Sequence, residues 1–446
     1  MTPSSPISPR SPSKSPLALW RATSLALFAG FVDCRCRSGE QTDSDARAPV
    51  ANSNEAEPDF AMDESDAGAD GAAVVPRCSV GPARMLVAVT PGADDAGADR
   101  TRYEAATIAM TPNGARAAMA DVSARQLILA SSPTERATIA IGPEPTQAIT
   151  IATAASATLV WTVTAQLRAR SQRAYVLADG ALRLLATHRG LPDDSLGIVS
   201  CSLGDSALIA WDESPTEGQS VVRAQRWSAT SRADPPLLTL SESGQDASDP
   251  VIVAAPGGGA ILAYLALQEV AVETANQSAA DIIVRAINAD GTPRGPAVNL
   301  TSRPKTRFGV ALHATSSGRW IAWRLAADSD HEGLGDGGRV AIVALGEDLR
   351  PVRSPEYLTD LDRVPAGRIS IVSEGATAEV YWTERRGEDL VTVRRAVSAD
   401  GRVLGEAREE PALGGQVPLG GDARAPRIAA WGRSGEPGFA IAQCPR

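Results

Sequence analysis

Short apolar runs, each ending in an aromatic residue, recur along the chain from residue 79 onward. They read ATLVW, ALIAW, AILAY, RWIAW, AEVYW and RIAAW, and successive runs lie 49 to 59 residues apart. The aromatic residues that end them are Trp161, Trp211, Tyr264, Trp323, Trp382 and Trp431. Met119, in ARAAMAD, takes the corresponding place 42 residues before the first of these. A regular spacing of this size indicates a structural repeat, here of seven units.

The fourth unit shows most clearly how each unit is built. PVIVAAPGGG reads as a strand followed by a glycine turn, AILAYLAL as a second strand, DIIVRAINADG as a third and PAVNLTS as a fourth. An Asp-Gly pair closes the third strand at Asp290, as it does at Asp179 and Asp400 in the second and sixth units. This pair favours a tight hairpin, because Gly accepts the positive φ that the turn requires. No stretch after residue 79 shows a sustained helical period with caps, so the domain is predicted to be all-β.

Four-stranded units of about 40 to 55 residues, repeated seven times, predict a seven-bladed β-propeller over residues 78–446. The pattern resembles the blade repeats of propellers on bacterial extracytoplasmic proteins, and it lacks the Gly-His and Trp-Asp marks of the WD40 type. The recurrent aromatic residue is expected to pack between blades, with a ring of ligand-stacking aromatics as the alternative. Tandem β-sandwich modules are a second possible architecture, and the degenerate first and seventh units leave six or eight blades open.

The seventh unit is short, because GFAIAQC supplies a third strand and no fourth follows it. The segment CSVGPARMLVAVTP, before the first unit, is a strand that no earlier hairpin claims. We expect this N-terminal strand to complete the last blade and close the ring. Antiparallel pairing would set Cys444, which ends one strand, beside Cys78, which begins the other, within reach of a disulfide. The alternative is two free thiols.

The first 77 residues carry features of export rather than of a fold. A basic start and an apolar stretch of about 11 to 16 residues indicate a secretory signal over residues 1–33. Cys34 resembles the lipid-acceptor cysteine of bacterial lipoproteins, although Asp33 stands where that pattern wants a small residue. A soluble secreted protein or a retained anchor is the alternative. Residues 34–77 are acidic and poor in large apolar side chains, which predicts a disordered linker.

Charge and cysteine usage limit the partners and the compartment. Acidic residues outnumber basic ones by 53 to 43, which argues against nucleic acid as a partner. A disulfide needs an oxidising compartment, so the periplasm, outer membrane or cell surface of a bacterium is expected. The predicted partner is a protein or a glycan, the only membrane contact is a lipid anchor, and the chain is expected to be a monomer.

One loop of the fifth unit, DSDHEGLGDGG, has the composition of a calcium site. Carboxylates on alternate residues, turned by a glycine, suit Ca²⁺, which takes six to eight oxygen ligands. The loop resembles the calcium loops of FG-GAP propeller repeats, departing from them by a glutamate where Asp or Asn is usual. That resemblance implies the ligands Asp328, Asp330, Glu332, Asp336 and the carbonyl of Leu334. A solvated acidic loop is the alternative.

No catalytic motif stands out among three histidines, five cysteines and the glycine-rich turns. The sequence therefore favours a non-catalytic propeller on the cell envelope that binds protein or glycan through its loops, rather than an enzyme. The alternative is a propeller hydrolase or lyase with a site at the central channel. Its candidate residues, at or near strand ends, are Asp121, Asp212, Glu384 and His313.

Overall fold

A computed structural model gives the fold of the chain as sheets of antiparallel strands. It describes residues 84–85, 103–111, 114–121, 124–131, 135–166, 169–191, 198–216, 219–231, 235–269, 278–301, 307–325, 338–360, 365–387, 389–411, 417, 429–431 and 439–441. Within these residues no helix has the length and apolar character needed to cross a bilayer. The prediction of an all-β domain is confirmed for this part of the chain.

The described residues form six four-stranded sheets, called blades one to six here in chain order. Blade one holds β2 (Tyr103–Thr111), β3 (Gly114–Asp121), β4 (Gln126–Ala130) and β5 (Arg136–Ala140). Blade two holds β6 (Thr146–Ala154), β7 (Ala157–Gln166), β8 (Ala169–Ala178) and β9 (Ala181–Leu191). Blade three holds β10 (Ile198–Leu203), β11 (Ser206–Thr216), β12 (Gln219–Ser228) and β13 (Leu238–Thr239).

The later blades repeat this order. Blade four holds β14 (Asp246–Ala254), β15 (Ala260–Glu269), β16 (Ser278–Ile287) and β17 (Pro293–Asn299). Blade five holds β18 (Arg307–Thr315), β19 (Gly318–Leu325), β20 (Arg339–Ala344) and β21 (Glu356–Tyr357). Blade six holds β22 (Pro365–Glu374), β23 (Thr377–Arg386), β24 (Asp389–Ser398) and β25 (Val403–Glu409).

A further sheet joins the two ends of the domain. It has the order β1-β27-β26, where β1 is Arg84–Met85, β27 is Phe439–Ile441 and β26 is Ala429–Trp431. The N-terminal strand β1 pairs antiparallel with β27, with Arg84 opposite Ile441. This is the partner and the direction that the sequence predicts for the N-terminal strand.

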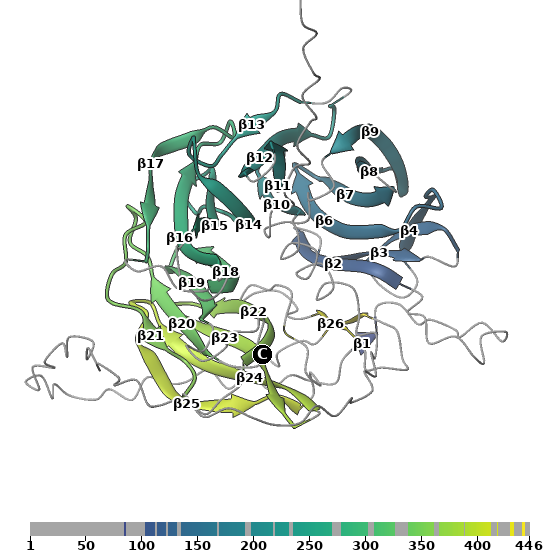
Figure 1. Cartoon of the computed structure of the whole chain (residues 1–446). Helices are drawn as coiled ribbons and strands as arrows, with labels where there is room; N and C mark the ends of the chain where they lie inside the picture. Colours follow the sequence, from purple (N-terminus) through teal and green to yellow (C-terminus); the bar gives the residue numbers. More distant parts are fainter. Residues whose placement is uncertain are drawn as a thin grey trace, which may run out of the picture. The chain divides into compact units, whose positions relative to one another are not determined.

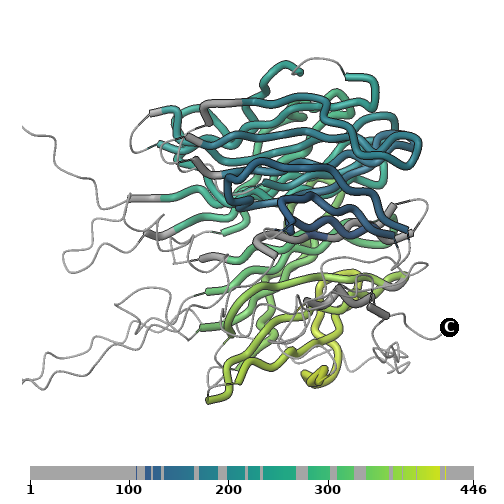
Figure 2. The backbone as a smooth tube through the Cα atoms, turned by 90° about the vertical axis from the view of Figure 1, so that its right-hand side faces the viewer, coloured from purple at the N-terminus to yellow at the C-terminus, as the bar shows by residue number. Residues whose placement is uncertain are grey.

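The blades follow one another around a common axis, which is the arrangement of a β-propeller (Figure 1). Their first strands lie nearest the centre, and β2, β6, β10, β14, β18 and β22 contact one another in that order. Seen from the side, strands of successive blades run alongside one another (Figure 2). Hydroxyl contacts join some of these axial strands, as between Thr150 and Ser200 at 2.7 Å.

Among the described residues, five apolar clusters form the core, each between two successive blades. The recurrent aromatic residue lies in the second strand of its blade, and Trp161, Trp211, Tyr264, Trp323 and Trp382 are all buried in these clusters. Their role in packing between blades is thereby confirmed. The alternative of an exposed ring of stacking aromatics is wrong for these five.

The Asp-Gly hairpin of blade six also packs against blade five. Gly401 has a φ of +87°, and a Cβ at this position would come within 2.8 Å of the Ala344 nitrogen in blade five. Only glycine meets both demands, since a side chain there would be strained and would collide with backbone. The neighbouring Ser398 carbonyl accepts a hydrogen bond of 2.8 Å from Trp320 Nε1 of blade five.

Candidate functional site

Five of the six axial strands in the blades are irregular near their first residues. The pairing of β2, β6, β14, β18 and β22 with the second strand of the blade shifts register there, whereas β10 pairs without a shift. Because the strands are equivalent, the bulges fall at the same end of the blades. Bulges are common next to active sites, since they re-aim a side chain out of the regular pleat.

Among the bulge residues whose side chains the structure describes, two charged ones are exposed, Asp249 in β14 and Arg368 in β22. Asp249 itself has a φ of +50°, and Gly367, just before Arg368, has a φ of +71°. These are left-handed conformations, which Asp tolerates and Gly adopts freely. We call Asp249 and Arg368 the axial pair.

A buried charged side chain of the preceding blade holds each of these bulges. The Asp212 carboxylate, in blade three, accepts a hydrogen bond of 3.4 Å from the backbone N–H of Asp249. Arg324, in blade five, donates a hydrogen bond of 3.0 Å to the Gly367 carbonyl. Asp212 and Arg324 occupy equivalent positions, each directly after the recurrent tryptophan of its second strand. The same contact between blades is thus made once by an acceptor and once by a donor.

Further buried carboxylates at this end of the blades are hydrogen-bonded within the protein. Glu213 accepts hydrogen bonds from Trp211 Nε1 at 3.1 Å and from Arg223 Nε at 2.8 Å. Glu384 accepts one from Trp382 Nε1 at 2.9 Å and pairs with Arg386. A carboxylate held in this way stabilises its neighbours and is poorly placed to react with a substrate, because its oxygens are already occupied.

The structure does not bring the four sequence-predicted candidates together. Asp121 ends β3 and accepts a hydrogen bond of 3.0 Å from the Ala124 N–H. His313, on β18, contacts the Ser373 hydroxyl at 2.8 Å and stacks on Trp320. Asp212 and Glu384 are buried with the partners given above. Of the four, Asp212 contacts the axial pair through its hydrogen bond from the Asp249 N–H, and it does so as a support.

Other predicted site residues lie outside the described part of the chain. These are the proposed disulfide cysteines and lipid-bearing cysteine, Cys78, Cys444 and Cys34, and the calcium loop residues Asp328, Asp330, Glu332, Leu334 and Asp336. Among the described residues, no group of three or more His, Cys, Asp or Glu side chains is arranged to hold a metal ion. Cys201 is described: it is buried as a free thiol, and burial raises its pKa to about 12.

Neither Asp249 nor Arg368 is among the site residues that the sequence predicts. Both precede an apolar run at the start of an axial strand, in SDPVIV and AGRISIV. The one available clue was the turn-forming residue at each bulge, Asp or Gly, where a regular strand favours neither. A strand start with this composition predicts a bulge but does not say which side chain it exposes.

Comparison with known proteins finds similarity in structure only. No protein-family model and no curated protein matches the chain. An α-L-arabinofuranosidase from Fusarium graminearum, solved as a mutant with an iminosugar inhibitor, matches with 7% identity, a TM-score of 0.45 and coverage of 72% of this chain and 98% of that one. An α-L-arabinanase from Penicillium chrysogenum, complexed with arabinobiose, matches with 12% identity, a TM-score of 0.43 and coverage of 82% and 98%.

These matches correct the functional expectation from the sequence. The matched structures also include an α-L-arabinofuranosidase from Lactobacillus brevis, at 14% identity, a TM-score of 0.35 and coverage of 58% and 93%. All three are enzymes by their names, which contradicts the expectation of a non-catalytic binding propeller that is not an enzyme. At such low identity the likeness concerns the fold, and no active-site residue is carried over from it.

Proposed function

We propose that the chain is a hydrolase of β-propeller architecture whose site lies at the bulged end of the axial strands. The observation that carries this proposal is the axial pair: bulges at equivalent places in blades four and six expose Asp249 and Arg368, and buried Asp212 and Arg324 hold those bulges from behind. Charged side chains on rigid, supported backbone are what a reacting site requires.

The two side chains suit complementary roles. The Asp249 carboxylate, exposed beside its support, acts as the acid–base group or nucleophile of bond cleavage. The Arg368 guanidinium presents several N–H donors in a fixed plane and binds substrate oxygen atoms. A glycan, rich in hydroxyl and ring oxygens, is the proposed substrate class, and arabinan oligosaccharides are the first to test because the matched enzymes are named for arabinose polymers.

The test is hydrolysis of an oligosaccharide panel by the full chain and by Asp249→Asn. The variant is expected to lose activity by about 10²- to 10⁴-fold, since it keeps the shape of the side chain and removes proton transfer. Asp179→Asn is the matched control, because Asp179 has a φ of +51°, a side chain 86% exposed and a place at the β8–β9 turn. Equal activity of the two variants would exclude Asp249 as the reacting group.

The finer architectural predictions belong to the same proposal. We propose seven blades, with the N-terminal strand completing the last, and export to an extracytoplasmic compartment with Cys34 as a lipid site. Cys78 lies six residues before Arg84, whereas Cys444 lies three after Ile441, so a bridge between them requires the longer arm to bend back. Non-reducing peptide mapping tests the Cys78–Cys444 link, and two alkylated thiols would exclude it.

Calcium binding at the loop of the fifth unit also stays a proposal. The carboxylates Asp328, Asp330, Glu332 and Asp336 supply hard oxygen ligands, with the Leu334 carbonyl as a fifth. Melting curves in Ca²⁺ and in EDTA test it. A higher melting temperature in Ca²⁺ that Asp328→Ala abolishes is the expected result, and identical curves would contradict the proposal.

A further inference from the structure

The side chains that blades three, four and five turn toward the next blade are apolar at five equivalent positions. Two of the positions lie in the second strand, two in the third strand, and one directly after the fourth strand. All are buried in the clusters between blades. They are Leu208, Ala210, Val222, Ala224 and Leu240 in blade three, Ile261, Ala263, Ile282, Val284 and Leu300 in blade four, and Trp320, Ala322, Val340, Ile342 and Leu358 in blade five.

Blade six has polar side chains at the same five positions. Glu410 takes the place of Leu358, because the N–H of each donates a hydrogen bond of 2.8 Å to the third strand of its blade. The second and third strands pair in the same way in the two blades, with Tyr381 opposite Arg394 in blade six. The five residues, each at most 9% exposed, are Glu379, Tyr381, Thr392, Arg394 and Glu410. We call them the polar face of blade six.

The charged residues of the polar face are paired with one another. Arg394 forms an ion pair with Glu379 and a second one, at 2.5 Å from Nε to Oε1, with Glu410. The Tyr381 hydroxyl donates a hydrogen bond of 2.7 Å to Glu379. These contacts lie within blade six, so they persist when the face is uncovered. Two carboxylates share one guanidinium, and burial raises the pKa of the Glu410 carboxyl, because covering the face disfavours its charge.

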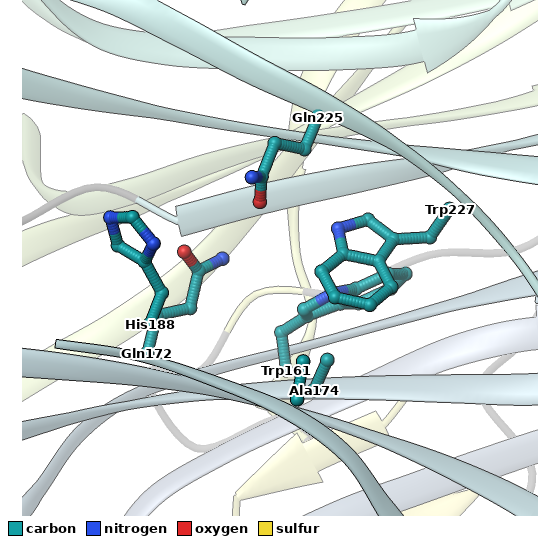
Figure 3. Close-up of a pocket in the computed structure, with 7 residues that line it drawn as sticks. Trp161, Gln172, Ala174, His188, Gln225 and Trp227 are labelled. Carbon is teal, nitrogen blue, oxygen red and sulfur yellow. The ribbon is translucent and has the colours of Figure 1, made fainter. Parts of the chain in front are cut away.

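The polar side chains between blades two and three are of a different kind. Gln172 and His188 of blade two and Gln225 of blade three line one narrow space beside the indoles of Trp161 and Trp227 (Figure 3). The two indoles belong to the apolar cluster that joins these blades. Separating blades two and three would therefore expose large apolar rings, whereas uncovering the polar face of blade six exposes groups that keep their partners.

The polar face looks away from blade five, since the apolar cluster shared with blade five lies on the other side of the blade. The next sheet in that direction is β1-β27-β26, called the closing sheet here, which lies between blades six and one (Figure 1). Apolar burial is the main favourable contribution to such contacts. A buried ion pair adds little, because the loss of hydration offsets its attraction. Blade six therefore holds the closing sheet less tightly than blades three to six hold one another.

We propose that the contact between blade six and the closing sheet is a seam at which the ring opens while blades one to six stay folded. Because β1 pairs with β27, the N-terminal and C-terminal strands leave blade six as one unit. The uncovered polar face does not attract an apolar blade of a second copy, which would cover its charge without compensating it. This proposal is independent of the proposed hydrolase site.

Native-state hydrogen exchange of the full chain, measured at low urea concentrations, tests the seam. The amides of β1 and β27 are expected to exchange together, about tenfold or more faster than those of β19, which lies between two apolar clusters. Exchange of β27 only together with β19, in one global step, would overturn the proposal. This measurement needs no variant.

A variant separates opening at the seam from fraying of short strands. Glu379→Met, Tyr381→Phe, Arg394→Met and Glu410→Met together replace the paired groups by apolar side chains of similar size. Replacing a buried ion-pair network in this way is commonly neutral or stabilising, so exchange at β27 is expected to slow by about tenfold. Unchanged or faster exchange would overturn the proposal, because the polar face would then not be what weakens the contact.

The matched control carries apolar substitutions on the exposed part of the same blade. Glu406→Met with Arg408→Met, on β25, removes two exposed charges and is expected to leave exchange at β27 unchanged. Equal slowing in the control and in the four-residue variant would contradict a role for the buried network.

Discussion

Blades three and six differ from blades two and five in the surroundings of one indole N–H. Trp211 and Trp382 each donate to a glutamate two residues further along the strand, Glu213 and Glu384. In blades two and five that position holds Val163 and Leu325, and the Nε1 atoms of Trp161 and Trp323 have no partner in the described chain. Burial of the ring is thus common to the repeat, whereas satisfaction of its N–H depends on a neighbour that varies.

The glutamate that accepts from the indole must itself be paired with a cation. A buried carboxylate must be paired, and Glu213 has Arg223 while Glu384 has Arg386. Three side chains therefore act as one unit in blades three and six. Blade four solves the problem differently: its aromatic residue is Tyr264, whose hydroxyl donates to Gln245 at 2.8 Å, and burial raises the pKa of that hydroxyl to about 12.

The largest expected change in the free energy of unfolding comes from removing the glutamate that joins the tryptophan and the arginine. Glu213→Leu leaves the Trp211 indole and the largely buried Arg223 guanidinium without their acceptor, and we expect a loss of about 2–4 kcal/mol in the free energy of unfolding. Glu406→Leu, on the exposed part of β25, is the control and should change it by less than about 0.5 kcal/mol. Urea unfolding measures both. Equal losses would mean that the glutamate does not stabilise blade three.

A smaller effect is expected when the glutamate is introduced where it is missing. Val163 is buried and faces Gln172 across the strand pair, so Val163→Glu buries a charge with no cation opposite and should cost about 1–3 kcal/mol. Leu325 faces Arg339, so Leu325→Glu gains a cross-strand ion pair and an acceptor for Trp323, with an effect between zero and a gain of about 1 kcal/mol. Thermal melts of both variants compare them, and a reversed order would refute the role of the opposing residue.

The smallest expected change in stability concerns the turn of blade six whose Ser398 carbonyl accepts the hydrogen bond from Trp320 of blade five. Asp400 orders that turn, and a hydrogen bond from the Ser398 hydroxyl holds the pKa of its carboxyl below the usual value. A lowered pKa in the folded state contributes stability above about pH 4, which is lost as the pH falls through the folded value. Because the side chain is nearly half exposed, the contribution is a few tenths of a kcal/mol.

Asp400→Asn should therefore lose a few tenths of a kcal/mol of stability near pH 7 and nothing below the folded pKa, which flattens the acid limb of the stability curve slightly. Unfolding measured between pH 3 and pH 7 checks this. A steeper acid limb in the variant would contradict the assignment of the hydrogen bond.

The amino-acid sequence by itself determined the repeat, the four strands of each unit, the Asp-Gly turns and the burial of the aromatic residues. These follow from alternation, turn chemistry and spacing, which act over a few residues and need no knowledge of neighbours. The pairing of β1 with β27 could also be predicted from the sequence. The N-terminal strand has no neighbour in its own unit, and the last unit lacks a strand, so pairing the two leaves no open sheet edge.

Only the tertiary structure decided which polar residues from different blades come into contact. Asp212 meets Asp249 and Arg324 meets Gly367 across 37 and 43 residues of sequence, from one blade to the next. Whether an indole N–H finds a glutamate, a carbonyl or no protein atom depends likewise on register and on the facing blade. Hydrogen bonds are directional and short, so a one-residue shift in any strand would exchange these partners, and no local pattern in the sequence encodes that geometry.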